Sequence, residues 1–87
     1  GFELEMSNNN ITAFPNPTKD YLMLSNNLGS LMTSITVSDN KGNLLYIDNN
    51  TYFDPFYFDF RDFQSGVYFI STIVNNQLVV KRVSLVR

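Results

Sequence analysis

Hydrophobic and polar residues alternate along most of the chain in short segments that Asn, Asp, Gly and Pro separate. A period of two is typical of β-strands with one buried face, and the 3.6-residue period of a long amphipathic helix is missing. The pattern therefore predicts an all-β fold. The expected strands are Ile11–Phe14, Tyr21–Ser25, Thr33–Ser38, Leu44–Asp48, Tyr57–Phe60, Val67–Val74 and Gln77–Leu85. Seven antiparallel strands of this length favour a β-sandwich.

Alternation within the strands also predicts which side chains form the core, because successive residues of a strand point to opposite faces. The inward positions are Leu22, Leu24, Ile35, Val37, Phe58 and Phe60. Asp59, between two of them, is expected to face solvent. The last two strands are apolar on both faces, which is typical of strands that lie centrally or meet another domain.

Turn residues connect these strands in a specific way. Asn75–Asn76 tolerates left-handed backbone conformations and predicts a tight type I′ hairpin between the last two strands. Asp39 can cap its own turn, and Gly42 supplies a positive φ, so a second hairpin is expected there. Pro15 and Pro17 lack a backbone N–H, so the chain must leave the sheet after the first strand.

The segment Phe63-Gln64-Ser65-Gly66-Val67-Tyr68 has the layout of a tyrosine corner. In Greek-key sandwiches such a tyrosine buries its ring and bonds through its hydroxyl to a backbone group a few residues upstream. We expect Tyr68 to have this role and Gly66 to serve as a turn glycine before it. The topology predicted from the spacing is a Greek key.

Composition excludes several kinds of chemistry. The 87 residues, 44% of them hydrophobic, are enough for one domain with one core. The sequence contains neither Cys nor His, so a disulfide, a cysteine zinc site and the commonest general base are excluded. An enzyme is therefore not expected, and neither is a metal or a cofactor.

Charge and hydropathy narrow the candidate partners. The net charge of −2 gives no basic surface of the kind that nucleic acid requires. No apolar stretch approaches the ~20 residues of a membrane-spanning helix. Residues 1–10 end in a run of Ser and Asn and are expected to form a linker, with the folded domain over residues 11–87.

Four segments occur in a recognisable order: Phe14-Pro15-Asn16-Pro17-Thr18-Lys19-Asp20-Tyr21-Leu22, Ile35-Thr36-Val37-Ser38-Asp39-Asn40-Lys41-Gly42, Gly66-Val67-Tyr68-Phe69-Ile70 and Lys81-Arg82-Val83. In this combination the chain resembles the C-terminal sorting domain of the type IX secretion system of Bacteroidota. The resemblance implies an Ig-like β-sandwich that serves as a sorting signal, with residues 1–10 as the linker from an upstream cargo domain in the same chain.

The resemblance also implies partners and a location. An outer-membrane translocon recognises the domain in the periplasm, and a sortase-like cell-surface peptidase commonly removes it, so the cargo is anchored at the cell surface or secreted. The residues that match the sorting motifs of the family are Pro15, Asn16, Pro17, Gly66, Tyr68, Lys81 and Arg87. Arg82 is an alternative to Arg87 as the counterpart of a second lysine. For the prolines, strand termination is an equally good explanation, and solvation is the commoner reason for Lys81 and Arg82.

Two other functions remain open at this stage. Tyr52, Phe53, Phe56 and Tyr57 surround Asp54-Pro55 and form a candidate interaction surface, because exposed aromatic residues stack on sugars or anchor protein interfaces. They suggest an Ig-like carbohydrate-binding or adhesion module. Asp59 and Asp62 are the candidate carboxylate pair of a glycosidase, although they flank a strand end and the sequence shows no pocket there.

Overall fold

The computed structural model describes residues 4–5, 11–26 and 31–87, and these contain strands and no helix. The strands are β1 (Leu4–Glu5), β2 (Ile11–Phe14), β3 (Tyr21–Asn26), β4 (Met32–Asp39), β5 (Leu44–Tyr52), β6 (Phe56–Asp59), β7 (Gly66–Val74) and β8 (Gln77–Leu85). The seven predicted strands are all present. The two-residue β1 lies inside the segment expected to be a linker, and the rest of that segment falls outside the described residues.

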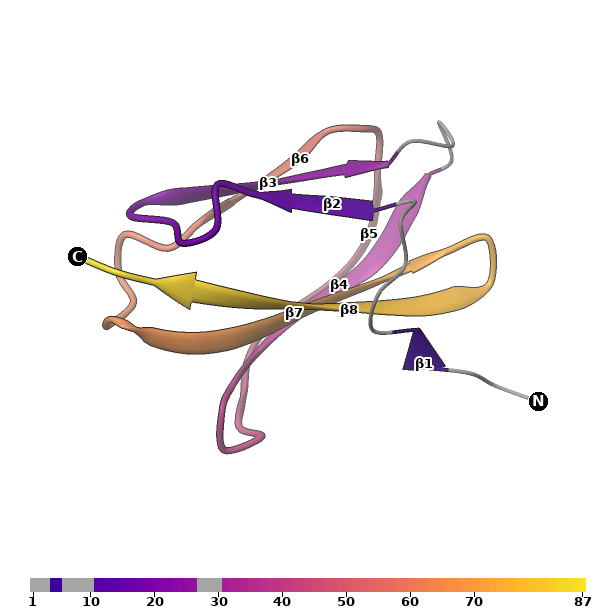
Figure 1. Ribbon diagram of the computed structural model, residues 1–87. Helices are drawn as coiled ribbons and strands as arrows, with labels where there is room; N and C mark the ends of the chain where they lie inside the picture. Colours follow the sequence, from indigo (N-terminus) through magenta and orange to yellow (C-terminus); the bar gives the residue numbers. More distant parts are fainter. Residues whose placement is uncertain (1–3, 6–10, 27–30) are drawn as a thin grey trace.

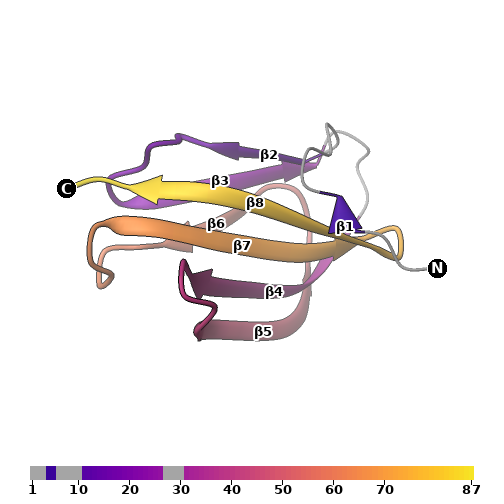
Figure 2. The same cartoon turned by 60° about the horizontal axis from the view of Figure 1, so that its bottom comes forward.

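The strands form two sheets packed face to face (Figure 1). One sheet has the order β1-β8-β7-β4-β5 and the other the order β2-β3-β6. Figure 2 shows β8, β7, β4 and β5 side by side in this order. The chain changes sheet between β1 and β2, between β3 and β4, between β5 and β6, and between β6 and β7. All pairs except the short β1–β8 pair are antiparallel, which confirms the Ig-like Greek-key sandwich.

The core lies between the sheets and contains every inward side chain that the alternation predicted. Its largest fully buried side chain is Phe60. Phe58, Phe63 and Tyr68 surround Phe60, with ring centroids between 4.7 and 5.4 Å from that of Phe60. Edge-to-face contacts of this kind add to the free energy gained from burial. The aromatic cluster therefore holds the crossover from β6 to β7.

The turns follow the predicted chemistry with one exception. Asn75 and Asn76 have φ values of 51° and 64°, and Gly42 has a φ of 87°. The Asp39 carboxylate accepts hydrogen bonds from the N–H groups of Lys41 and Asn43, each at 2.9 Å. These bonds cap the turn between β4 and β5. The hydrogen bond from the Asn43 side chain, together with these two backbone bonds, lowers the pKa of Asp39.

Gly66 is the exception, because it is not a turn glycine of the expected kind. It is the first residue of β7 and has no positive φ. A Cβ atom at this position would lie 3.9 Å from Cε2 of Tyr68, an ordinary contact distance. The steric reason for glycine at this position is therefore weaker than the sequence pattern suggested.

β5 is longer than predicted and ends at Tyr52 instead of Asp48. Its second half, Asn49–Thr51, is exposed and has no alternation of apolar side chains. Backbone pairing with β4 continues nevertheless, through Thr51 opposite Thr33 and Tyr52 opposite Met32, after a register shift between Ile35 and Thr33 of β4. The loop from β5 to β6 is thus reduced to residues 53–55.

Candidate functional site

Three segments that are far apart in the sequence meet at one end of the sandwich. They are the turn of residues 15–20, the loop of residues 60–65 and the chain end at residues 84–87, all at the left of Figure 1. We call this region the motif end. Six of the seven predicted sorting-motif residues lie in these segments, border them or bond to them: Pro15, Asn16, Pro17, Gly66, Tyr68 and Arg87.

Asn16 pairs with the edge of β8 through its side chain. Its amide nitrogen donates to the carbonyl oxygen of Arg82 at 2.9 Å, and its Oδ1 accepts from the N–H of Ser84 at 3.0 Å. Two residues later, at Thr18, the backbone itself pairs with this strand end. The N–H of Thr18 donates to Ser84 O, and the N–H of Val86 donates to Thr18 O. The proline segment thus covers the edge of β8, where backbone N–H and C=O groups would otherwise lack hydrogen-bond partners.

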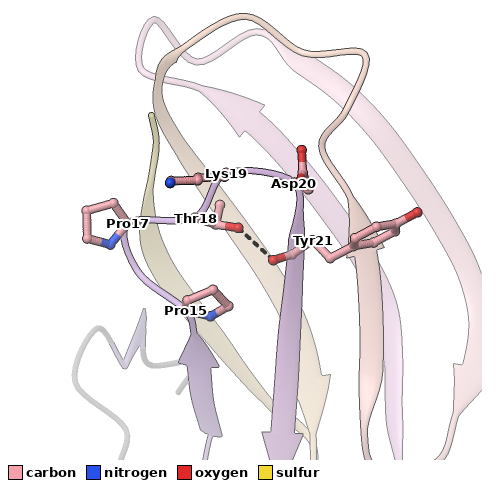
Figure 3. A pocket seen from close by; sticks show the side chains of 6 residues that line it. All are labelled: Pro15, Pro17, Thr18, Lys19, Asp20 and Tyr21. Carbon is pink, nitrogen blue, oxygen red and sulfur yellow. Dashed lines mark hydrogen bonds between the residues drawn. The ribbon is translucent and has the colours of Figure 1, made fainter. Parts of the chain in front are cut away.

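Thr18 fixes the turn from inside, and the sequence analysis did not single it out. Its side chain is fully buried, and its hydroxyl donates to the carbonyl oxygen of Tyr21 at 2.6 Å (Figure 3). Ser and Thr hydroxyls often bond to nearby backbone groups in turns, so a threonine next to Pro17 was an available signal.

Arg87 anchors the chain end to the loop before β7. Its guanidinium donates to the carbonyl oxygens of Phe60 and Phe63, with 2.9 Å between Nε and Phe63 O. Its backbone N–H donates to the hydroxyl of Ser65, and its Nη1 lies 3.8 Å from the Asp20 carboxylate. Hydrogen bonds from a charged donor are stronger than neutral ones, so Arg87 holds this corner together.

The tyrosine corner is confirmed. Tyr68 is 7% exposed, and its hydroxyl donates to the carbonyl oxygen of Gln64 at 2.5 Å. This bond closes the loop over the aromatic core and places Ser65 next to Arg87. The tyrosine corner therefore stabilises the loop of residues 60–65 at the motif end.

Lys81 lies apart from the motif end, near the middle of β8 opposite Ile70. It has the same strand parity as the buried Val79 and Val83, and it is half-buried. Burial lowers the pKa of its ammonium group. Arg82 points to the opposite face and is exposed. The two basic residues that the sequence placed together therefore face different environments.

An open cleft of about 410 Å³ lies beside the proline turn (Figure 3). Its lining residues are Pro15, Pro17, Thr18, Lys19, Asp20 and Tyr21. Beyond Tyr21, the guanidinium carbon of Arg61 lies 5.1 Å from the centroid of the tyrosine ring. Arg61 also binds the Asp59 carboxylate, with 2.9 Å between Nη2 and Oδ2. Its hydrogen bonds hold the pKa of Asp59 below its usual value.

The paired state of Asp59 bears on the carboxylate-enzyme hypothesis. A general acid of a glycosidase needs a raised pKa, whereas the pKa of Asp59 is lowered by Arg61.

Within the described part of the chain, no group of three or more acidic residues is placed to hold a metal ion. The described residues also include no helix long and apolar enough to cross a membrane.

The four aromatic residues of the candidate interaction surface face different directions. Phe56 is buried and lies against Tyr52, with 4.7 Å between the ring centroids, and the Tyr52 hydroxyl donates to Asp48. Phe53, in the loop, is 80% exposed, and Tyr57, on β6, is 61% exposed. Phe53 and Tyr57 are thus the two that a partner could reach.

The fold and the motif end together define an Ig-like β-sandwich domain whose characteristic residues gather at one end of the molecule. A family model for the secretion system C-terminal sorting domain matches residues 12–86, and the chain belongs to this family. It is a C-terminal sorting signal of type IX secretion, which marks a protein for export to the cell surface or for release. No curated protein and no solved structure shows significant similarity to the chain.

Proposed function

We propose that the outer-membrane translocon of type IX secretion recognises the folded motif end of this domain and exports the cargo attached to it. The observation that carries the proposal is the bonding of Asn16, Thr18 and Arg87 to partners more than 20 residues away in the sequence. The motif residues form one surface only after the chain has folded. A receptor that binds this surface would therefore select folded domains.

Hydrogen bonding separates two groups of motif residues. Asn16, Tyr68 and Arg87 direct their polar groups to backbone atoms of the domain itself. Pro15 and Pro17 are exposed at the cleft. We assign the first group to building the surface and the second to contact with the receptor. We assign Gly66, at the start of β7, and Lys81, near the middle of β8, to neither group.

The domain acts as a substrate and not as a catalyst in this proposal. Residues 1–10 link it to an upstream cargo domain, and a sortase-like cell-surface peptidase cuts within that linker after export. Residues 11–87 then form the sorting domain. The absence of His and Cys from the sequence supports a role without catalysis.

The direct experiment is a fusion of residues 11–87 to the C-terminus of a periplasmic reporter in a Bacteroidota host. The proposal predicts that the reporter appears in the medium or at the cell surface, and that it stays in the periplasm when the translocon gene is deleted. A reporter that stays in the periplasm of the intact host, although it is folded and undegraded, would refute the proposal.

A further inference from the structure

The outer face of the three-stranded sheet carries a row of large apolar side chains. Phe14 on β2 lies opposite Met23 on β3, which lies opposite Tyr57 on β6. The neighbouring residues Leu22, Leu24 and Phe58 point to the core, so these three side chains point away from it. Phe14 is 43% exposed and Tyr57 61% exposed.

A second pair extends this row along the same face. Tyr21, which is 46% exposed, lies opposite Asp59. Arg61 stacks over the Tyr21 ring and binds Asp59, so a guanidinium is fixed at the border of the apolar row. We name Phe14, Tyr21, Met23 and Tyr57 the docking face.

The docking face continues into the cleft of the motif end. Tyr21 belongs to both, and Phe14 directly precedes Pro15, which lines the cleft. Lys19 also lines the cleft, and the described residues provide no carboxylate within salt-bridge distance of its ammonium group. Asp20, in contrast, lies near Arg87. The cleft thus combines two prolines and a tyrosine ring with a lysine that forms no salt bridge to the described residues.

The chemistry of this surface favours a protein partner. Tyr, Phe, Met and Arg are the residues enriched in the cores of protein interfaces. A sugar ring needs an open aromatic face on which to stack, and Arg61 already covers one face of Tyr21. The ammonium group of Lys19 is matched best by a carboxylate from the partner.

We propose that the docking face and the cleft bind a protein loop that inserts an apolar side chain between Pro15 and Tyr21 and sets a carboxylate against Lys19. This inference rests on the proposed function, since the loop belongs to the outer-membrane component that receives the sorting domain. It assigns the contact to the three-stranded sheet and leaves the outer face of the five-stranded sheet free.

The test uses two pairs of variants in the reporter fusion. Tyr57→Ser removes a ring from the docking face, and Phe53→Ser removes the more exposed ring from the β5–β6 loop. Lys19→Glu reverses the charge at the cleft, and Lys41→Glu makes the same change in the β4–β5 turn. We expect Tyr57→Ser and Lys19→Glu each to reduce the exported fraction about tenfold, as the loss of ~1.4 kcal/mol of binding would. The two controls should export within about twofold of the parent.

Thermal unfolding of each purified variant checks that all four remain folded, and Lys19→Arg, which keeps the charge, should export as the parent does. If the parent fusion is not exported, the proposed function itself fails. If the parent is exported and the docking variants match their controls, the proposed function stands and the docking surface is wrong. Normal export combined with glycan binding that Tyr57→Ser abolishes would also overturn the inference, because the face would then bind sugar.

Discussion

The side chain of Asn16 forms with β8 the pair of hydrogen bonds that a residue of a neighbouring strand would form. Its amide offers a donor and an acceptor with the spacing of a peptide group, and both meet the backbone of β8. Aspartate and alanine each lack the donor, so neither could form both bonds. Pro15 and Pro17 on either side restrict the backbone, which limits the conformational freedom lost when Asn16 binds.

Arg87 and Arg82 provide a matched comparison at the residue scale. Arg87→Ala removes charged hydrogen bonds to two backbone carbonyl groups and should lower the free energy of unfolding by about 1.5–3 kcal/mol. Arg82→Ala trims an exposed side chain and should change it by less than about 0.5 kcal/mol. Urea unfolding of both variants gives the two values. Equal effects would show that Arg87 does not anchor the chain end.

Gly42 and Gly66 provide a second comparison. Gly42 has a φ of 87°, so Gly42→Ala should cost about 1 kcal/mol even though no atom lies within 4 Å of the new Cβ. Gly66→Ala adds a Cβ at contact distance from Tyr68 and should change the stability by less than about 0.5 kcal/mol. The same urea titration measures both. A larger loss for Gly66→Ala would restore the turn role that the sequence pattern suggested for Gly66.

At the scale of strands and turns, local chemistry was predictable and long-range contacts were not. The hairpin at Asn75–Asn76 and the turn at Asp39–Gly42 depend on backbone preferences that the residues themselves carry. The extension of β5 through Asn49–Thr51 depends on pairing with β4, and its own sequence gives no sign of it. Intrinsic strand propensity is a weak predictor for such a segment, because its pairing with a partner strand decides its conformation.

The candidate site follows the same division. The tyrosine corner was predictable because Tyr68 and Gln64 are four residues apart. The bond between Asn16 and Arg82 joins residues 66 positions apart, and no periodicity or spacing announces such a contact. The sequence therefore predicted the candidate motif residues and did not predict the long-range hydrogen bonds that Asn16 and Arg87 form.

The edge of β8 supplies a prediction at the element scale. Asn16→Ala removes the two side-chain bonds that cover this edge and should lower the free energy of unfolding by about 1–2 kcal/mol. The amide of Ser84 should also exchange its hydrogen faster, since Asn16 is its acceptor. Asn40→Ala, in the exposed β4–β5 turn, is the control. Unchanged exchange at Ser84 would contradict the pairing role of Asn16.

At the scale of the whole molecule, the fold and the signal depend on each other. The sandwich core holds β3 and β6 of one sheet against the sheet that contains β8, and only then do the proline turn, the tyrosine corner and the chain end meet. The proposed docking face spans β2, β3 and β6, and at this region β2 ends, β3 begins and β6 ends. Export machinery that recognises the folded domain would select cargo whose C-terminal domain is complete and folded.

Export of a reporter fused to a Leu24→Asp variant tests this dependence most directly. Leu24 is 1% exposed and lies in none of the sorting-motif segments, so a buried carboxylate there should unfold the domain and leave every motif residue in the chain. We expect the full-length fusion to accumulate in the periplasm while the parent fusion is exported. Export of the unfolded variant at the parent level would contradict the account, because the linear motifs alone would then be the signal.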